Sequence, residues 1–135
     1  MGHKKFNCNG FNLPLFPFLN LKKCMSSVNK VILIGHLGKN PEIRYLENGR
    51  ARVTFRLATN ESYKNKKGEK ITHIEWHHIV LWTLLAELAE KYLTKGNQVY
   101  LEGKITTRSY LDKDDNKKSI TEIIGQQLVF LGKTQ

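Results

Sequence analysis

Residues 50–59 alternate strictly between two kinds of side chain, and this pattern constrains the fold more than any other feature of the sequence. Positions 51, 53, 55, 57 and 59 hold Ala, Val, Phe, Leu and Thr, whereas positions 50, 52 and 56 hold arginine and position 54 holds threonine. Successive side chains of a β-strand point to opposite faces. The pattern therefore predicts a half-buried strand with three arginines on its open face.

Four further segments have the length and composition of strands, and one segment has the spacing of a helix. Strands are predicted over residues 29–37, 71–82, 98–110 and 119–131, the last bent at Gly125, with a hairpin tip at residues 112–118. A polar basic loop is expected over residues 63–70. Thr83 is expected to cap a helix that ends at Lys95-Gly96-Asn97.

The order of these elements predicts the fold class. An all-β chain with one helix, placed between the third and fourth of five strands, has the element order of the OB-fold barrel. Other small all-β arrangements remain open at this point, but an immunoglobulin-like sandwich needs seven or more strands and has no such helix.

Composition indicates one globular domain with a polyanionic partner. The 135 residues carry 22 Lys and Arg against 12 Asp and Glu, a formal charge of +10, and 40% of them are hydrophobic. An excess of this size favours a nucleic acid or an anionic membrane surface as partner, and a well-solvated surface is the plainer reading.

Residues 1–24 are set apart as an N-terminal extension, expected to be poorly ordered. Their apolar stretch, residues 11–21, is too short for a membrane span, which needs roughly 20 residues, and Pro14 and Pro17 interrupt it. Both cysteines, Cys8 and Cys24, lie in this extension, so no disulfide framework is expected in the domain over residues 25–133. A reducing compartment is the default.

Aromatic and basic side chains are predicted to share the faces opposite the core. In residues 71–82, Ile79 and Leu81 should face inward, and Trp76, His78, Val80 and Trp82 outward. Tyr110 should project with Arg108 and Lys104. Aromatic rings on which bases stack, interleaved with cations that follow phosphates, are typical of proteins that bind single-stranded nucleic acid. The structural alternative is that these rings fill a subunit interface or the barrel end.

Several segments resemble one family. Residues 28–35 (VNKVILIG), 41–45 (PEIRY), 57–63 (LATNESY), 75–77 (EWH) and 95–103 (KGNQVYLEG) are similar to the bacterial and mitochondrial single-stranded DNA-binding proteins, in register from about Met25 to Gly132. The resemblance implies an OB-fold homotetramer that wraps single-stranded DNA in replication, recombination and repair. It implies base stacking on Tyr63, Trp76, Trp82 and Tyr110, and a subunit interface that includes His77, Gln98 and Tyr100.

Three departures from the family pattern are visible. Tyr63 and Tyr110 replace the Trp of many members, and Trp82 replaces Phe, so the stacking surface is kept. His78, Leu84 and Thr106 stand where Arg or Lys is common, so other cations should contact phosphates. The family's acidic C-terminal tail is absent after residues 134–135, which makes tail-mediated recruitment of replication and repair proteins doubtful.

The sequence therefore predicts a binding protein for single-stranded DNA that is not an enzyme, needs no cofactor or metal and does not enter a membrane. His73, His77, His78 and Glu75 could suggest a metal site, but adjacent histidines on a strand point to opposite faces.

The expected location is the bacterial cytoplasm, at the nucleoid, with the mitochondrial matrix as the less favoured alternative. The rival function is a protein-interaction module of the primosomal-accessory type. The cations expected to contact phosphates are Lys30, Arg44, Arg52, Arg56, Lys64, Lys66, Lys67, Lys104 and Arg108.

Overall fold

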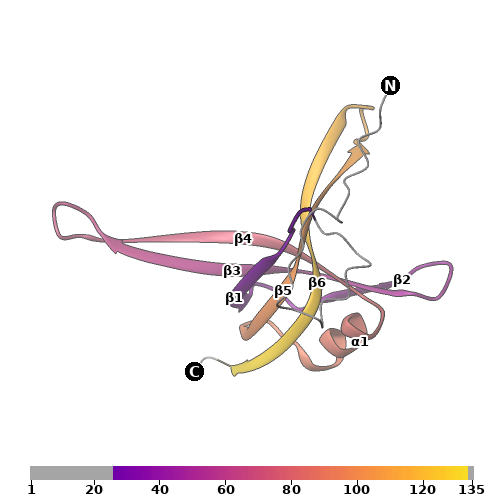
Figure 1. Ribbon diagram of the computed structural model, residues 1–135, viewed down its shortest axis with the longest axis horizontal. Helices are drawn as coiled ribbons and strands as arrows, with labels where there is room; N and C mark the ends of the chain where they lie inside the picture. The colour runs from indigo at the N-terminus through magenta and orange to yellow at the C-terminus, as the bar shows by residue number, and fades with distance from the viewer. Residues whose placement is uncertain (1–25, 134–135) are drawn as a thin grey trace, which may run out of the picture.

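The alternating segment forms the start of a long strand around which a β-barrel closes (Figure 1). The computed structural model describes residues 26–133. Its elements are β1 (Val31–Leu37), β2 (Glu42–Tyr45), β3 (Ala51–Lys64), β4 (Lys70–Trp82), α1 (Thr83–Tyr92), β5 (Asn97–Leu111) and β6 (Lys117–Lys133). The strands follow the order β1-β5-β6-β4-β3-β2, and an additional pairing of β1 with β3 closes the barrel.

The core lies inside this barrel and under the helix. Ala51, Val53, Phe55 and Leu57 are each at most 4% exposed, so the predicted inward face of the alternating segment is confirmed. Ile79 and Leu81 of β4 join them, with Val99 and Leu101 of β5 and with Ala86, Ala89 and Leu93 in or just after α1. Burial of this apolar surface is the main force that holds the curved sheet closed.

The predicted fold class is confirmed, with one difference in element count. β2 pairs with β3 and was not expected as a strand, so the helix falls between β4 and β5 instead of between a third and a fourth strand. β2 has four residues, of which only Ile43 packs against the core. A segment this short shows no alternation that would separate it from a loop.

The predicted loop over residues 63–70 is confirmed only at residues 65–69, because β3 and β4 continue past the barrel as a two-stranded ribbon (Figure 1). They stay paired as far as Lys64 and Lys70, and only residues 65–69 form the turn. Asn65 closes the turn, since its side-chain oxygen accepts hydrogen bonds from the backbone N–H groups of Lys67 and Glu69 at 2.9 Å. Both faces of the ribbon are exposed, so its sequence is polar and reads as a loop.

The start of α1 also differs from the prediction. Trp82, in extended conformation, is the residue that precedes the first turn, and no side chain caps the helix. Thr83 is instead the first helical residue, with φ of 53°.

β6 crosses the barrel with two irregularities in its pairing with β5. One of them follows the pair Gly103 and Gly125, beyond which Glu102 pairs with Gln127, so one residue of β6 is left over. A bulge of this kind bends a strand, at the place where the bend was predicted. A Cβ on Gly125 would lie 2.3 Å from Cδ2 of Leu81, which explains the glycine.

The predicted extension over residues 1–24 and the end at residues 134–135 lie outside the described residues. Within residues 26–133, no helix has the length and apolar character needed to cross a membrane.

Candidate nucleic-acid interface

The even-numbered side chains of β3 and β4 share one face of the two strands, here called the outer face, which carries aromatic and basic groups. Across the two strands, Arg52 lies opposite Trp82, Arg56 opposite His78, and Ala58 opposite Trp76. Trp76 is 49% exposed, whereas Val80 between the two tryptophans is buried. Six residues of strand separate the two rings, which corresponds to about 20 Å. The outer face thus has a tryptophan toward each end and cations in between.

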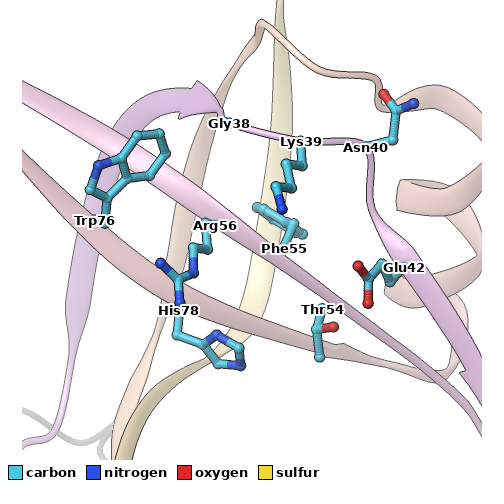
Figure 2. A pocket seen from close by; sticks show the side chains of 9 residues that line it. All are labelled: Gly38, Lys39, Asn40, Glu42, Thr54, Phe55, Arg56, Trp76 and His78. Atoms are coloured by element: carbon cyan, nitrogen blue, oxygen red, sulfur yellow. The ribbon is translucent and has the colours of Figure 1, made fainter.

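A groove beside Trp76 opens between β3, β4 and the loop that follows β1 (Figure 2). It encloses about 410 Å³ and is lined by Gly38, Lys39, Asn40, Glu42, Thr54, Phe55, Arg56, Trp76 and His78. A Cβ at position 38 would lie 2.4 Å from the Trp76 ring, so glycine is needed for the indole to lie there. Figure 2 shows Lys39 reaching over the groove from the loop. Sequence reasoning missed Lys39 because Gly38-Lys39-Asn40-Pro41 reads only as a turn signal.

A second group of cations surrounds Trp82. The guanidinium carbon of Arg50 lies 5.1 Å from the centre of the indole ring, and that of Arg52 lies 5.8 Å away. Both distances are in the range of cation–π interactions. Arg44 of β2 pairs directly with Arg52, and like charges placed opposite each other are unfavourable unless an anion lies between them. Arg50 was not among the predicted DNA contacts, although its position in the alternation already placed it on this face.

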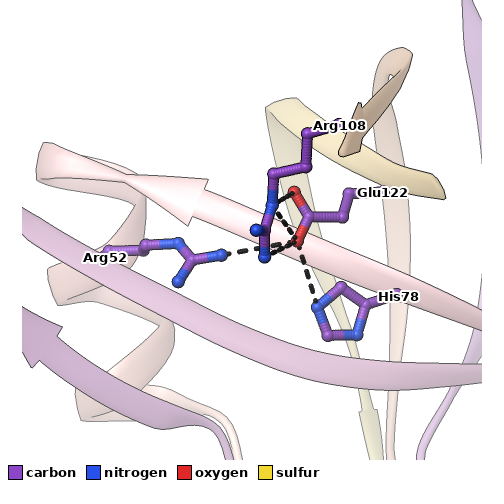
Figure 3. Close-up of polar contacts among 4 residues, drawn as sticks. All are labelled: Arg52, His78, Arg108 and Glu122. Carbon is purple, nitrogen blue, oxygen red and sulfur yellow. Dashed lines mark hydrogen bonds and ion pairs between the residues drawn. The ribbon is translucent and has the colours of Figure 1, made fainter. Parts of the chain in front are cut away.

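One buried carboxylate, Glu122 of β6, gathers basic side chains from three other strands (Figure 3). Arg108 of β5 donates from Nε and Nη2 at 3.1 to 3.3 Å, and Arg52 donates from Nη2 at 3.4 Å. Nε2 of His78 lies 3.6 Å from the same carboxylate, an ion pair when the ring is protonated. The hydrogen bond and charge of Glu122 raise the pKa of Arg108, which stays a cation. Sequence reasoning missed Glu122. The only feature of the sequence that could have indicated it is an acidic residue at an outward position of an apolar strand.

Tyr110 belongs to this side of the molecule and Tyr63 does not. Tyr110, 43% exposed, lies two residues from Arg108 on the same face of β5. Tyr63, 57% exposed, lies in β3 opposite Ile71, not in a loop. Its odd position places it on the other face of the ribbon from Trp76. The structure therefore places Trp76, Trp82 and Tyr110 on one side of the molecule, and Tyr63 on the opposite face of the ribbon.

The remaining predicted phosphate contacts lie in different surroundings. Lys30 pairs with Glu102 at 3.5 Å, and Lys104 is exposed on β5. Lys64 lies directly opposite Lys70 at the base of the hairpin turn, and Lys66 and Lys67 lie in the turn. All four of these lysines are exposed, so a strand that runs along the ribbon can reach them.

The predicted interface residues divide between two places. Gln98 and Tyr100 lie on β5, opposite His36 and Ile34 of β1. The Tyr100 hydroxyl donates to Glu102, which raises the pKa of Tyr100 and lowers the pKa of Glu102. His77 lies on β4, where a hydrogen bond of 2.9 Å joins its Nε2 to the Thr59 hydroxyl.

The histidines of β4 do not converge. His77 contacts Thr59 and His78 contacts Glu122, on opposite faces of the strand, while His73 pairs with Glu75 at 3.2 Å. In the described part of the chain, no group of three or more His, Cys, Asp or Glu side chains is placed to hold a metal ion.

A closed barrel of this topology is an OB fold. Its outer face combines aromatic and basic side chains, as do the surfaces of OB-fold proteins that bind nucleic acid. Residues 28–131 match the model of the single-strand binding protein family. The chain belongs to that family, and the resemblance found in the sequence is confirmed.

Named relatives agree with this assignment. The chain is 44% identical over 106 residues to the single-stranded DNA-binding protein of Neisseria meningitidis serogroup A, a match that covers 78% of this chain and 61% of the relative. It is 43% identical over 112 residues to single-stranded DNA-binding protein 1 of Xylella fastidiosa, with 82% of each chain covered. This chain therefore spans about three fifths of the length of the Neisseria protein.

Solved structures show the same fold. A Plasmodium falciparum SSB complex with single-stranded DNA has a TM-score of 0.71 and 38% identity, and the match covers 81% of this chain and 99% of that one. A deletion mutant of the single-stranded DNA binding protein from Thermus aquaticus has a TM-score of 0.67 and 29% identity, with 77% and 50% covered.

Proposed function

We propose that this protein binds single-stranded DNA with little dependence on base sequence, without catalysing a reaction. The observation that carries the proposal is the pairing of tryptophan and arginine along the outer face, where Arg52 lies opposite Trp82 and Arg56 lies two residues from the strand position opposite Trp76. The relatives named as single-stranded DNA-binding proteins support it.

The chemistry of the outer face suits this ligand. Each base of a single strand offers a π face to an exposed ring, and stacking contributes roughly 1 to 3 kcal/mol per base. Because every base can stack, rings alone give affinity without sequence selection. We assign the stacking positions to Trp76, Trp82 and Tyr110, and keep Tyr63 as a contact for a strand that passes around the ribbon.

Phosphates are assigned to the cations around these rings. Near Trp82, Arg44 lies at the strand position opposite Arg52, so a phosphate bound there would be attracted by two neighbouring cations. The proposed phosphate contacts are those predicted from the sequence, Lys30, Arg44, Arg52, Arg56, Lys64, Lys66, Lys67, Lys104 and Arg108, together with Lys39 and Arg50 from the structure.

A titration with oligo-dT at several salt concentrations tests the proposal. Tryptophan fluorescence should be quenched as bases stack, and the affinity should fall steeply with salt as counterions are released. Unchanged tryptophan fluorescence at saturating oligonucleotide would contradict the assignment of these residues to base stacking. Intact DNA binding after replacement of both tryptophans by alanine would instead favour the protein-interaction module.

We also propose that four copies of the chain assemble. Ile32 and Ile34 of β1 and Val129 of β6 are 54%, 53% and 42% exposed around Tyr100 and Gln98, where β1, β5 and β6 lie side by side. Exposed apolar groups gathered in this way are typical of a protein interface. Light scattering should give four times the chain mass of 15.6 kDa, and a monomer at micromolar concentration would refute the assembly.

The biological setting is proposed from the family. Protection of single strands in replication, recombination and repair follows from sequence-tolerant binding. We place the protein in the bacterial cytoplasm, at the nucleoid, and the Neisseria and Xylella relatives support this choice over the mitochondrial matrix.

A further inference from the structure

Glu122 is the one charged side chain that is buried among residues 26–132, with 5% of its surface exposed. A carboxylate removed from water is costly unless cations and hydrogen bonds compensate it. Here the compensation comes from Arg108 and Arg52, with His78 beside them (Figure 3). Four strands therefore meet at one carboxylate.

Each of the two arginines that Glu122 binds also lies beside a proposed stacking residue. Arg52 lies over the Trp82 ring while its Nη2 donates to Glu122. Arg108 shares a face of β5 with Tyr110, two residues away. Trp82 at the end of β4 and Tyr110 on the β5–β6 hairpin are thus connected through Arg52, Glu122 and Arg108.

Glu122 leaves both arginines able to bind a further anion. A guanidinium has five N–H donors in a fixed fork. Arg108 uses Nε and Nη2 for Glu122, and its side chain is 51% exposed, so the donors of Nη1 remain. The side chain of Glu122 itself is only 6% exposed, so a phosphate cannot take its place on the arginines without opening the sheet.

We propose that Glu122 is a positioning residue for single-stranded DNA. It orients Arg52 and Arg108 so that their free donors face phosphates, and it holds the surfaces of Trp82 and Tyr110 at a fixed separation. This inference rests on the proposed function and assigns to an acidic residue a favourable role in binding a polyanion.

The variant Glu122→Gln separates this role from simple electrostatics, because the two predict opposite signs. Removal of a negative charge beside the DNA should by itself strengthen binding and steepen its salt dependence. If Glu122 positions the arginines, the affinity for a short oligo-dT falls about tenfold or more. The slope of log K against log salt then becomes shallower by about 0.7 to 1.4, for one or two phosphates at about 0.7 each.

Glu61→Gln is the charge-matched control. Glu61 is exposed on β3 and forms no ion pair with any of the described residues. This variant should bind as the parent protein does, or slightly more tightly. Circular dichroism and light scattering check that each variant keeps its fold and assembly.

Arg108→Lys keeps the positive charge but removes the guanidinium that hydrogen-bonds to both oxygens of Glu122. This variant tests the proposal if Glu122→Gln does not fold. It should weaken binding in the same direction, and the effects of Arg108→Lys and Glu122→Gln should be less than additive in the double variant. Parental or tighter binding by Glu122→Gln, or parental binding by Arg108→Lys, overturns the positioning role. Failure of the parent protein to bind oligo-dT overturns the proposed function instead.

Discussion

Replacement of Trp76 with alanine removes the aromatic surface beside the groove and should weaken binding of a short oligo-dT by about 5- to 60-fold. The indole is 49% exposed. For a side chain of roughly 200 Å² this leaves about 100 Å² for a base to cover, which at about 25 cal/mol per Å² gives an upper bound near 2.5 kcal/mol. The lower bound of about 1 kcal/mol is the weakest base stacking measured by alanine substitution.

The assay is a fluorescence-anisotropy titration with a labelled oligo-dT of about eight nucleotides, a length within the site size of a single OB fold. Ile74→Ala is the matched control, since Ile74 is 48% exposed and lies two residues away on the same face of β4. Trp76→Phe should recover most of the affinity because it keeps a ring.

The reasoning would be refuted if Trp76→Ala, with parental circular dichroism and assembly, bound within twofold of the parent protein. It would also fail if Ile74→Ala lost as much affinity as Trp76→Ala, because the loss would then reflect apolar surface on the ribbon and not stacking.

Three further predictions concern stability and salt dependence. Gly125→Ala should destabilise the protein by about 1–3 kcal/mol and lower its Tm by several degrees, because the new Cβ meets Leu81 at 2.3 Å; an unchanged melting curve would contradict this. The hydrogen bond from Tyr100 lowers the pKa of Glu102 from 4.5, so the stability it confers is present above that pH and is lost as pH falls below it. Tyr100→Phe should therefore flatten the acid side of a melting-temperature profile, and a profile as steep as the parent's would count against the bond. Arg50→Ala should reduce the salt slope of oligo-dT binding by about 0.7, provided that Arg50 contacts one phosphate.

Much of the barrel could be predicted because its core strands obey a period of two. Val53, Leu57, Ile79 and Leu81 each lie two residues from another buried apolar residue of the same strand, and each is fully buried. The alternation was wrong only at Val80, which was expected on the open face and is buried. The outward direction of Trp76 and Trp82 follows from the same alternation. Where the strands leave the core as the β3–β4 ribbon, both faces are exposed to water and alternation no longer reports on burial. The sequence therefore placed the end of β3 too early and made the loop too long.

The candidate site could be predicted less completely. The two tryptophans and Arg52, Arg56 and Arg108 were found from pattern and resemblance. Lys39 and Glu122 were not, since their roles depend on side chains of other strands, which for Glu122 lie between 14 and 70 residues away in the chain.

The sequence by itself determined which face of each core strand is apolar and which carries arginine and tryptophan, because side-chain direction in a strand depends only on position along it. Only the tertiary structure decided which faces lie together. The pairing of β4 with β6 and of β6 with β5 brings His78, Glu122 and Arg108 together, and the pairing of β3 with β4 places Arg52 over Trp82. These contacts are set by the register between strands, which depends on how the whole barrel closes over its core and is not encoded in any one segment.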